Sequence, residues 1–395
     1  MNIILKNRHI LEKIELLMQC AIKVKNDNKT KDHSIALKFD SAKKLLTCST
    51  HVLTKPAQAS FVERVHESTV TQDFSIELSA LLLHSIAKKL HKKEFLDISI
   101  DFNTTTLSIF AAVVFEPDLL NEKPIIKRMK STAKYQQRFK ILESTAPYDF
   151  GYSTANSSTR TINREDAVRM ANALNVLKEV KSNNTLYIAL NEHSIYSSYF
   201  SAALSKSQNV EPASVVLDLR TFEALTTLAE RFTRNTENTP ELVIVDDHFF
   251  VRLGNFIVKL ETIGIQNKPS MLPTHYITSN AVEFSPGDAL TALEKINISQ
   301  PSGENTLGIL PIDESRLGIK LTTNQYATAE SAFDVTCNFM RTQETYHVSY
   351  RLFVQAISFV AAEETAYIYG LDSAHSRICI SDKKKSQIVL VPTHL

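Results

Sequence analysis

Glycine is scarce in this sequence, and its scarcity excludes two kinds of binding site. Eight of the 395 residues are glycine, well below the average usage of about 7%. None falls in a GxGxxG or GxxxxGK[ST] arrangement, the spacings with which a backbone loop cradles a dinucleotide or nucleotide phosphates. The sequence therefore predicts no such loop and no bound cofactor.

Cysteine and the common catalytic patterns are also sparse. The four cysteines are scattered, with no CxxC pair and no Cys/His spacing that would bind zinc. No HxxxH helix pattern and no GxSxG elbow occurs. The run Asp246-Asp247-His248 resembles a metal-ligand cluster, but it stands between two strand patterns, where Asp is an ordinary turn residue. We expect no metal site, no catalytic residue and no enzymatic activity.

Long apolar runs are absent as well. No stretch of about 18 apolar residues occurs, and the first residues, MNIILKNRHI, carry charges where a secretory signal would be apolar. We therefore expect a soluble, cytoplasmic protein with no membrane partner. The length of 395 residues and the hydrophobic content of 43% suffice for several globular domains.

The sequence does contain a pattern that occurs three times. Its copies are FSIELSALLLHSIAKKL at 74–90, VVLDLRTFEALTTLAER at 215–231 and YHVSYRLFVQAISFVAA at 346–362. Each begins with apolar residues two apart, the period of a strand, and continues with apolar residues three or four apart, the period of a helix. Runs rich in β-branched and aromatic residues follow each helix. The unit therefore reads β-α-β-β-β.

A weaker unit of the same kind precedes each copy. Its helices are expected at 8–20, 162–177 and 284–296, each followed by strands. Asn163 can cap the second helix, and Ser285-Pro286 places proline at the first helical position of the third. The chain thus has six half-units, two per domain, and an α+β fold of three tandem domains.

A basic segment interrupts this rhythm at 121–142, where seven Lys and Arg residues stand against one acid, Glu122. It reads as a solvated connection, or, because Tyr135 and Phe139 interleave with the cations, as a nucleic-acid contact. We expect the first domain at 1–120, this connecting segment at 121–145, the second domain at 146–275 and the third at 276–395.

The repeats and several stretches resemble the bacterial DNA polymerase sliding clamp, the β-type processivity factor. These stretches are VRLGNFIVKLETIG at 251–264 with MLP at 271–273, ESRLGIKLTT at 314–323, and the tail QIVLVPTHL at 387–395. The resemblance implies a head-to-tail homodimer whose six domains close a ring around duplex DNA, with helices inside and sheets outside. It further implies sequence-independent DNA binding, and a DNA polymerase and a clamp loader as partners. A clamp-fold scaffold that never encircles DNA is the alternative.

The inner helices of such a ring should carry cations toward phosphates, since duplex DNA presents one negative charge per ~1.7 Å of its axis. The alternative for each cation is a solvated helix face. The expected DNA-binding residues are Lys23, Lys25, Lys88, Lys89, Lys92, Lys93, Arg164, Arg169, Lys178, Lys181, Arg220, Arg231 and Arg234. In the third domain the only comparable cations are Lys295 and Arg351.

The resemblance also implies a groove for partner peptides, bordered by the C-terminal tail. Here the alternative is a final strand that merely completes a sheet. The stretch HSIYSSYF at 193–200 stands where the family carries Thr-Asp-Gly-His-Arg-Leu, so an altered peptide specificity is expected. The residues expected at the groove are Met271, Pro273, Val391, Pro392, Thr393, His394 and Leu395.

Ring closure is expected to join an edge of the first domain to the third domain of a partner. The apolar strand at 107–115 is the candidate edge, because an open edge this hydrophobic would otherwise promote aggregation. The expected interface residues are Leu107, Ile109, Ile296 and Ile298. A dimer is favoured over a trimer because six domains match the family's ring.

Overall fold

The computed structural model has an α+β fold in which helices and strands form two compact units. Unit 1 comprises Met1–Ser157 and Asn238–Glu261, and unit 2 comprises Ser158–Glu237 and Thr262–Leu395. The structure describes residues 2–6, 13–14, 17, 34–50, 57–90, 95–115, 125–128, 135–141, 157–180, 185–206, 211–234, 239–245, 248–270, 272, 277, 280–297, 305–322, 328–337, 345–371 and 377–394. No helix in these ranges is long and apolar enough to cross a membrane.

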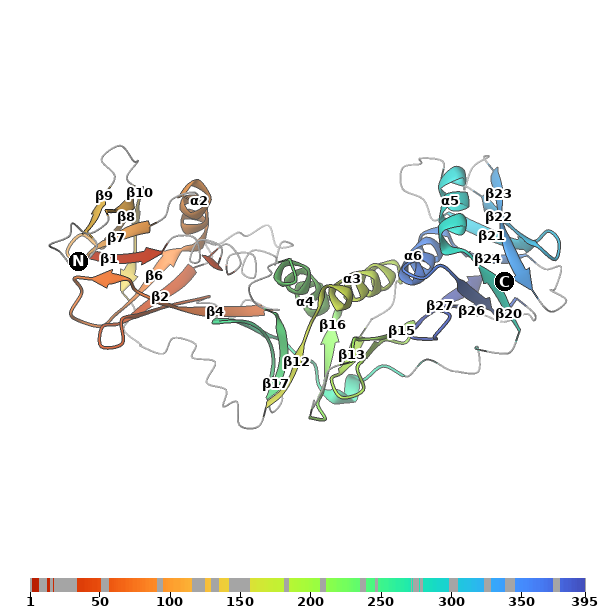
Figure 1. The fold of residues 1–395 in the computed structure, drawn as a ribbon, viewed down its shortest axis with the longest axis horizontal. Coiled ribbons are helices and arrows are strands. Elements are labelled where there is room, and N and C mark those ends of the chain that lie inside the picture. The colour runs from red at the N-terminus through yellow and green to blue at the C-terminus, as the bar shows by residue number, and fades with distance from the viewer. Residues whose placement is uncertain are drawn as a thin grey trace. The chain divides into compact units, whose positions relative to one another are not determined.

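Unit 1 contains two antiparallel sheets and the helix α2 (Ala80–Leu90) (Figure 1). The first sheet has the order β10 (Tyr135–Arg138), β8 (Thr106–Phe115), β7 (Phe95–Asp101), β1 (Asn2–Lys6) and β5 (Glu67–Ser68), and β9 (Ile125–Arg128) also pairs with β8. The second contains, in order, β11 (Lys140–Ile141), β6 (Phe74–Ser79), β2 (Ser34–Asp40), β3 (Leu45–Thr50), β4 (Ala57–Arg64), β19 (Phe256–Leu260), β18 (His248–Leu253) and β17 (Glu241–Val245).

Unit 2 is built on one long sheet with the helices α3 (Arg164–Glu179), α4 (Leu219–Phe232), α5 (Pro286–Ile296) and α6 (Tyr350–Val360). The unit also includes the short helix η2 (Ile265–Asn267), and β12 (Ser157–Thr161) leads into α3. The sheet order is β16 (Ser214–Asp218), β13 (Thr185–Ala189), β14 (Ser194–Tyr196), β15 (Phe200–Ala203), β27 (Gln387–His394), β24 (Tyr346–Ser349), β21 (Thr306–Pro311), β22 (Arg316–Thr322), β23 (Thr328–Cys337), β20 (Ala281–Phe284), β25 (Ala366–Tyr369) and β26 (Arg377–Asp382).

The three expected strand–helix copies are confirmed as β6–α2, β16–α4 and β24–α6. The helices begin where their capping residues predict. Asn163 and Asp166 form a reciprocal capping box at α3, and the Ser285 hydroxyl accepts from the Asp288 N–H at α5, with Pro286 in the first turn. Of the helix expected at 8–20, only Lys13, Ile14 and Leu17 lie among the described residues.

Two strand pairings of the same kind join half-units. In unit 1, β19 pairs antiparallel with β4, and Phe256 lies opposite Phe61 with their ring centroids 6.3 Å apart. In unit 2, β15 pairs antiparallel with β27, and Phe200 lies opposite Val389. Each pairing joins the last strand of a second half-unit to the β4-type strand of a first half-unit. We call these two pairings the joints.

The basic segment forms strands where it is described. Its part β10 pairs with β8, and β11 pairs with β6, so the segment touches both sheets of unit 1. Phe139 is buried between them, with its ring centroid 5.6 Å from that of Phe102 and its N–H donating to the Thr105 carbonyl. The predicted domain boundaries stay a prediction, because the compact units divide the chain differently.

The scarcity of glycine has a visible structural consequence in the turns. Lys44, Thr105, His193 and Lys385 all adopt positive φ, between 49° and 56°. Side chains other than glycine rarely adopt this conformation, because Cβ crowds the backbone there. The strain at these four turn residues must be offset by hydrogen bonds and packing around each turn.

Candidate nucleic-acid interface

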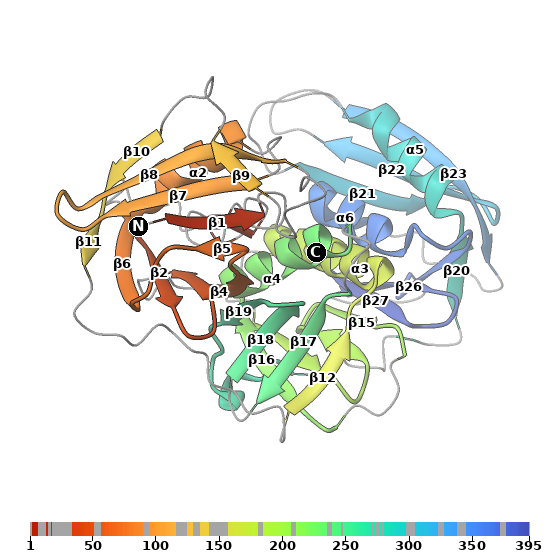
Figure 2. The same cartoon turned by 60° about the vertical axis from the view of Figure 1, so that its left-hand side comes forward.

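Most of the expected DNA-binding residues that the structure describes lie on or directly after α3 and α4. These two helices pack side by side (Figure 2). Lys178 near the end of α3 forms a 2.8 Å ion pair with Glu223 near the start of α4, so the two helices run antiparallel. The start of α3 therefore lies at the same end of the pair as the last turn of α4. Arg164, Arg231 and Arg234 therefore lie at the same end of the helix pair.

The arginines of this pair differ in how they are engaged. Arg164, Arg220, Arg231 and Arg234 are exposed, and none has an ion-pair partner within the described part of the chain. Arg169 is different, because it pairs with Glu165 at 2.5 Å and donates to the Ala203 carbonyl at 2.5 Å. Arg169 and Lys178 are thus partly neutralised, and the four other cations retain their charge for an anionic ligand.

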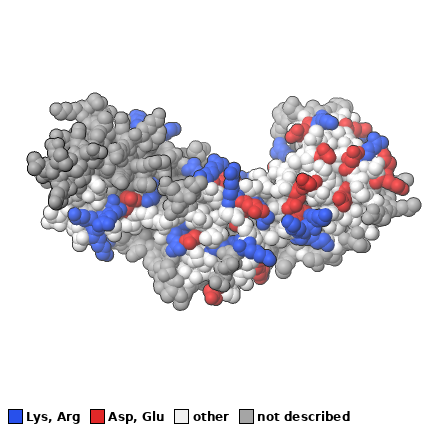
Figure 3. Space-filling view, viewed as in Figure 1, with Lys and Arg blue, Asp and Glu red and all other residues white. Residues whose placement is uncertain are grey.

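The distribution of charge over unit 2 is uneven. Lys and Arg side chains gather over the α4 region, while both signs of charge mix over the part that contains α5 (Figure 3). On α5 and α6, the cations are Lys295 and Arg351, both exposed. A polyanion lying along the helices would therefore meet its densest positive charge at α3 and α4.

Other expected DNA-binding residues lie on or beyond α2. Lys88 and Lys89 are exposed in its last turn, and the Lys89 ammonium lies 5.6 Å from the centroid of the Tyr135 ring. The remaining expected residues fall outside the described ranges: Lys23, Lys25, Lys92, Lys93 and Lys181.

The tail does not form the groove wall that was expected at Val391. Its side chain is fully buried, as are those of Val389 and Leu390, so both faces of β27 are covered at this point. Pro392 and Thr393 are half-buried, and the backbone of His394 pairs with His347. Beside Pro392, Arg377 lies 6.0 Å from the Tyr199 ring centroid, a contact that sequence reasoning missed. Met271, Pro273 and Leu395 lie outside the described residues.

The open edge expected at 107–115 is wrong. The strand β8 pairs with β7 on one side, and with β10 and β9 on the other, and the side chains of Leu107 and Ile109 are buried. Sequence reasoning missed this because the segment that covers the edge reads as a basic linker. Ile296 is also buried, at the end of α5, and Ile298 lies outside the described residues.

Two strand edges matter for assembly. In unit 1, β10 lies with β9 on the outer side of β8, and Arg138 and nearby Lys140 are exposed. In the described part of unit 2, Thr328–Asp334 of β23 pairs only with β22, and Glu330 and Asp334 are exposed. The β10 edge thus presents two cations and the β23 edge two acids, of which Glu330 also forms a 2.7 Å ion pair with Lys320 of β22. The described residues contain no group of three or more His, Cys, Asp or Glu that could hold a metal ion.

Comparison with solved structures finds this fold along the whole chain. The DNA polymerase III subunit beta of Borrelia burgdorferi matches with a TM-score of 0.70 at 14% identity, covering 100% of this chain and 98% of that one. The DNA polymerase sliding clamp of Pseudomonas aeruginosa matches with 0.70 at 10%, covering 100% of both chains. The DNA polymerase III beta subunit of Thermotoga maritima matches with 0.67 at 11%, covering 100% and 99%. No family model and no curated protein matches the sequence. The resemblance to sliding clamps is thus confirmed as a shared fold.

Proposed function

We propose that this protein is a DNA sliding clamp, a non-enzymatic processivity factor that encircles duplex DNA and tethers a DNA polymerase. The observation that carries the proposal is the full-length match to sliding-clamp structures, at TM-scores near 0.7. Processivity in such a device comes from topology, because a closed ring cannot leave the duplex sideways. Its contacts to phosphate can then remain few and exchangeable. A clamp loader and a cytoplasmic location belong to the same proposal.

In this proposal the antiparallel pair of α3 and α4 provides the main contact to the duplex. Arg164, Arg231 and Arg234 lie at one end of the pair and Arg220 at the other. Exposed guanidinium groups attract phosphates and release counterions without reading base sequence. Lys88 and Lys89 on α2 would extend the same function into the first half of the chain, together with the expected cations outside the described ranges.

The joints support a specific way of closing the ring. Each joint pairs the last strand of a second half-unit with the β4-type strand of a first half-unit. By the same repeat, the corresponding edge in the first repeat's second half-unit is formed by β9 and β10, which both pair with β8. The strand β23 matches β4, since Val65 donates its N–H to the Lys44 carbonyl of the β2–β3 turn and Val335 to the Ser315 carbonyl of the β21–β22 turn. We propose that β10 of one copy pairs with β23 of a second copy, and that two such contacts complete a head-to-tail dimer.

This assembly can be tested by charge, because the proposed edges are of opposite sign. Glu330→Lys with Asp334→Lys places positive charge opposite Arg138 and Lys140, and should shift the protein from dimer toward monomer in light scattering. Adding Arg138→Glu and Lys140→Glu should restore the dimer. Glu363→Lys with Glu364→Lys makes the same change in net charge after α6 and should leave the mass unchanged. A wild-type monomer, or an unaffected edge variant, would refute this mode of closure.

We further propose that partner peptides dock beside the end of β27, near Pro392. The pair of Arg377 and Tyr199 gives this region a cation and an aromatic ring, which suits a peptide with an acidic or aromatic anchor. Val391, which is fully buried, is not part of this proposal.

A scaffold that docks proteins without encircling DNA is the second candidate. It is favoured by the small number of exposed cations on α5 and α6, which leaves the helices of the third repeat nearly neutral. In that case, substitution of the α4 arginines would leave the affinity for every binding partner unchanged.

A further inference from the structure

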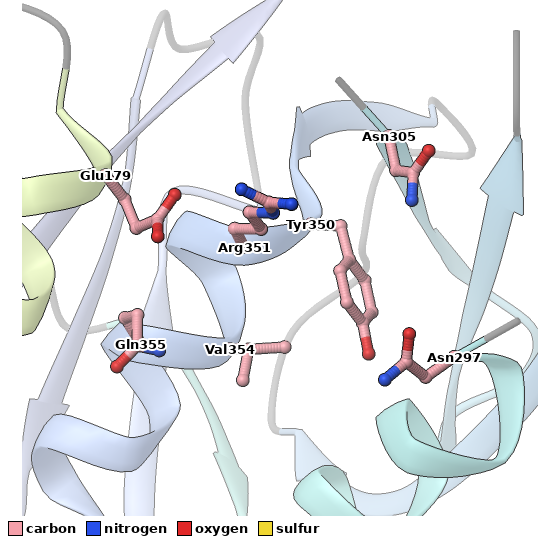
Figure 4. A pocket seen from close by; sticks show the side chains of 7 residues that line it. All are labelled: Glu179, Asn297, Asn305, Tyr350, Arg351, Val354 and Gln355. Carbon is pink, nitrogen blue, oxygen red and sulfur yellow. The ribbon is translucent and has the colours of Figure 1, made fainter. Parts of the chain in front are cut away.

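A polar pocket of about 390 Å³ lies among the ends of three helices in unit 2. Figure 4 shows Glu179 at the end of α3, Asn297 after α5, and Tyr350, Arg351, Val354 and Gln355 on the first turns of α6. Neither the tail region nor the cations of α4 contributes to it. The pocket lies beside the helix cations, since it includes Arg351 and the last residue of α3, but its other lining residues have no part in the proposed clamp function.

The charge of the pocket wall is balanced. Arg351 is exposed, Glu179 is half-buried, and the two extend from neighbouring helices on the same side of the pocket (Figure 4). Arg351 would attract a phosphate group and Glu179 would repel it. A cation would meet the opposite pair of forces. A neutral polar ligand that can donate and accept hydrogen bonds fits this wall best.

Three of the other polar side chains of the pocket are amides. Asn297, Asn305 and Gln355 have no side-chain hydrogen bond to any described residue. The Tyr350 hydroxyl, by contrast, is already used, since it donates to the Leu293 carbonyl at 3.1 Å. Tyr350 is 9% exposed and therefore offers the pocket a small part of its ring, and the half-buried Val354 beside it offers a further apolar surface.

We infer that this pocket binds a nucleobase. A base has flat apolar faces that can lie against Tyr350 and Val354, and an edge of donors and acceptors that amides and an arginine can match. An apolar ligand would leave the amide groups unpaired, at a cost. The base could belong to a free nucleoside or to an unpaired nucleotide of single-stranded DNA, and the site does not require a closed ring.

The test uses the full-length protein and neutral probes. Each of the four deoxynucleosides, and deoxyribose as the probe without a base, is titrated by isothermal calorimetry. A ligand of about 18 non-hydrogen atoms is expected to bind with a dissociation constant on the order of 0.1 mM. Binding of a fluorescent single-stranded 12-nucleotide DNA is measured by anisotropy. We expect at least one deoxynucleoside or the single strand to bind, and deoxyribose not to bind.

Val354→Phe fills the pocket and should weaken that binding at least tenfold. Val168→Phe makes the same substitution at an exposed position of α3, 49% accessible, and should leave it unchanged. Gln355→Ala, a change at a half-buried polar residue, should weaken binding several-fold and serves if Val354→Phe unfolds. If the pocket variants weaken binding of the single-stranded DNA but of no deoxynucleoside, single-stranded DNA is the source of the base. The inference is overturned if no probe loses affinity in the pocket variants, or if deoxyribose binds as well as the nucleosides.

Discussion

The turns β13–β14 and β21–β22 occupy the same place in the repeat but are held by different chemistry. The first is anchored from the core: Arg160 is 1% exposed and donates to the Leu190 carbonyl and to His193 Nδ1 at 2.6 Å. The second is anchored locally: Asp313 accepts from the N–H and hydroxyl of Ser315, both at 2.8 Å, at the surface. One turn thus depends on a buried side chain 30 residues away, and the other on its own sequence.

This difference extends to the strands that precede α3 and α5. Counted from their caps, Asn163 and Ser285, the buried Arg160 of the second repeat corresponds to the buried Val282 of the third. Burial lowers the pKa of Arg160, and Asp166, 3.9 Å away, opposes that shift. The same backbone is therefore stabilised by an ionic network in one repeat and by apolar packing in the other. The network is sensitive to the loss of any one member.

The largest effect is expected from Arg160→Val, which gives the second repeat the residue of the third. Asp166 would stay buried without its cation, so the free energy of unfolding should fall by about 3–5 kcal/mol in urea denaturation. Adding Asp166→Asn removes the uncompensated charge and should recover part of this loss. If Arg160→Val alone is as stable as the wild type, the network does not hold the turn.

A smaller effect is expected on DNA binding, where the two repeats also differ. Arg231→Gln with Arg234→Gln should weaken binding to duplex DNA and make the slope of log K against log salt less steep by about 2. Lys295→Gln with Arg351→Gln removes the same charge from α5 and α6 and should change the slope by less than about 1. Equal slopes for the two variants in an anisotropy titration would remove the contrast between the repeats.

The smallest effect is expected on stability at low pH. Hydrogen bonds from Ser315 lower the pKa of Asp313 from its ordinary value of 3.8 to about 2. Because this pKa is depressed, its contribution to stability is present above pH 3.8 and is lost as the pH falls toward 2. NMR titration should show the Asp313 carboxyl changing with an apparent pKa near 2, together with the amide of Ser315. Titration at the ordinary value would mean that the turn is not held by this side chain.

The sequence predicts the local units of this fold well. Apolar periodicity and capping residues identify α2 to α6 and the strands that lead into α2, α4 and α6, because those signals lie within about 20 residues of one another. These are properties of the chain near each residue.

Long-range pairing could not be predicted in the same way. The basic segment at 121–142 has no strand period of its own, and only its pairing with β8 and β6 makes it part of two sheets. Likewise, Arg160 stands in the polar run SSTRT, where nothing signals that it is buried among partners more than 30 residues away. The antiparallel packing of α3 and α4, which places Arg164 at the same end as Arg231 and Arg234, is also a long-range feature that could not be predicted.

The central claim is that the protein holds DNA by encircling it. The most direct measurement is retention of the protein on nicked circular duplex DNA, loaded with a clamp loader, before and after a single cut that linearises the circle. A closed ring should be retained on the circle and lost from the linear form, because it slides off the ends. Equal retention on both forms, or retention on neither, would contradict the claim.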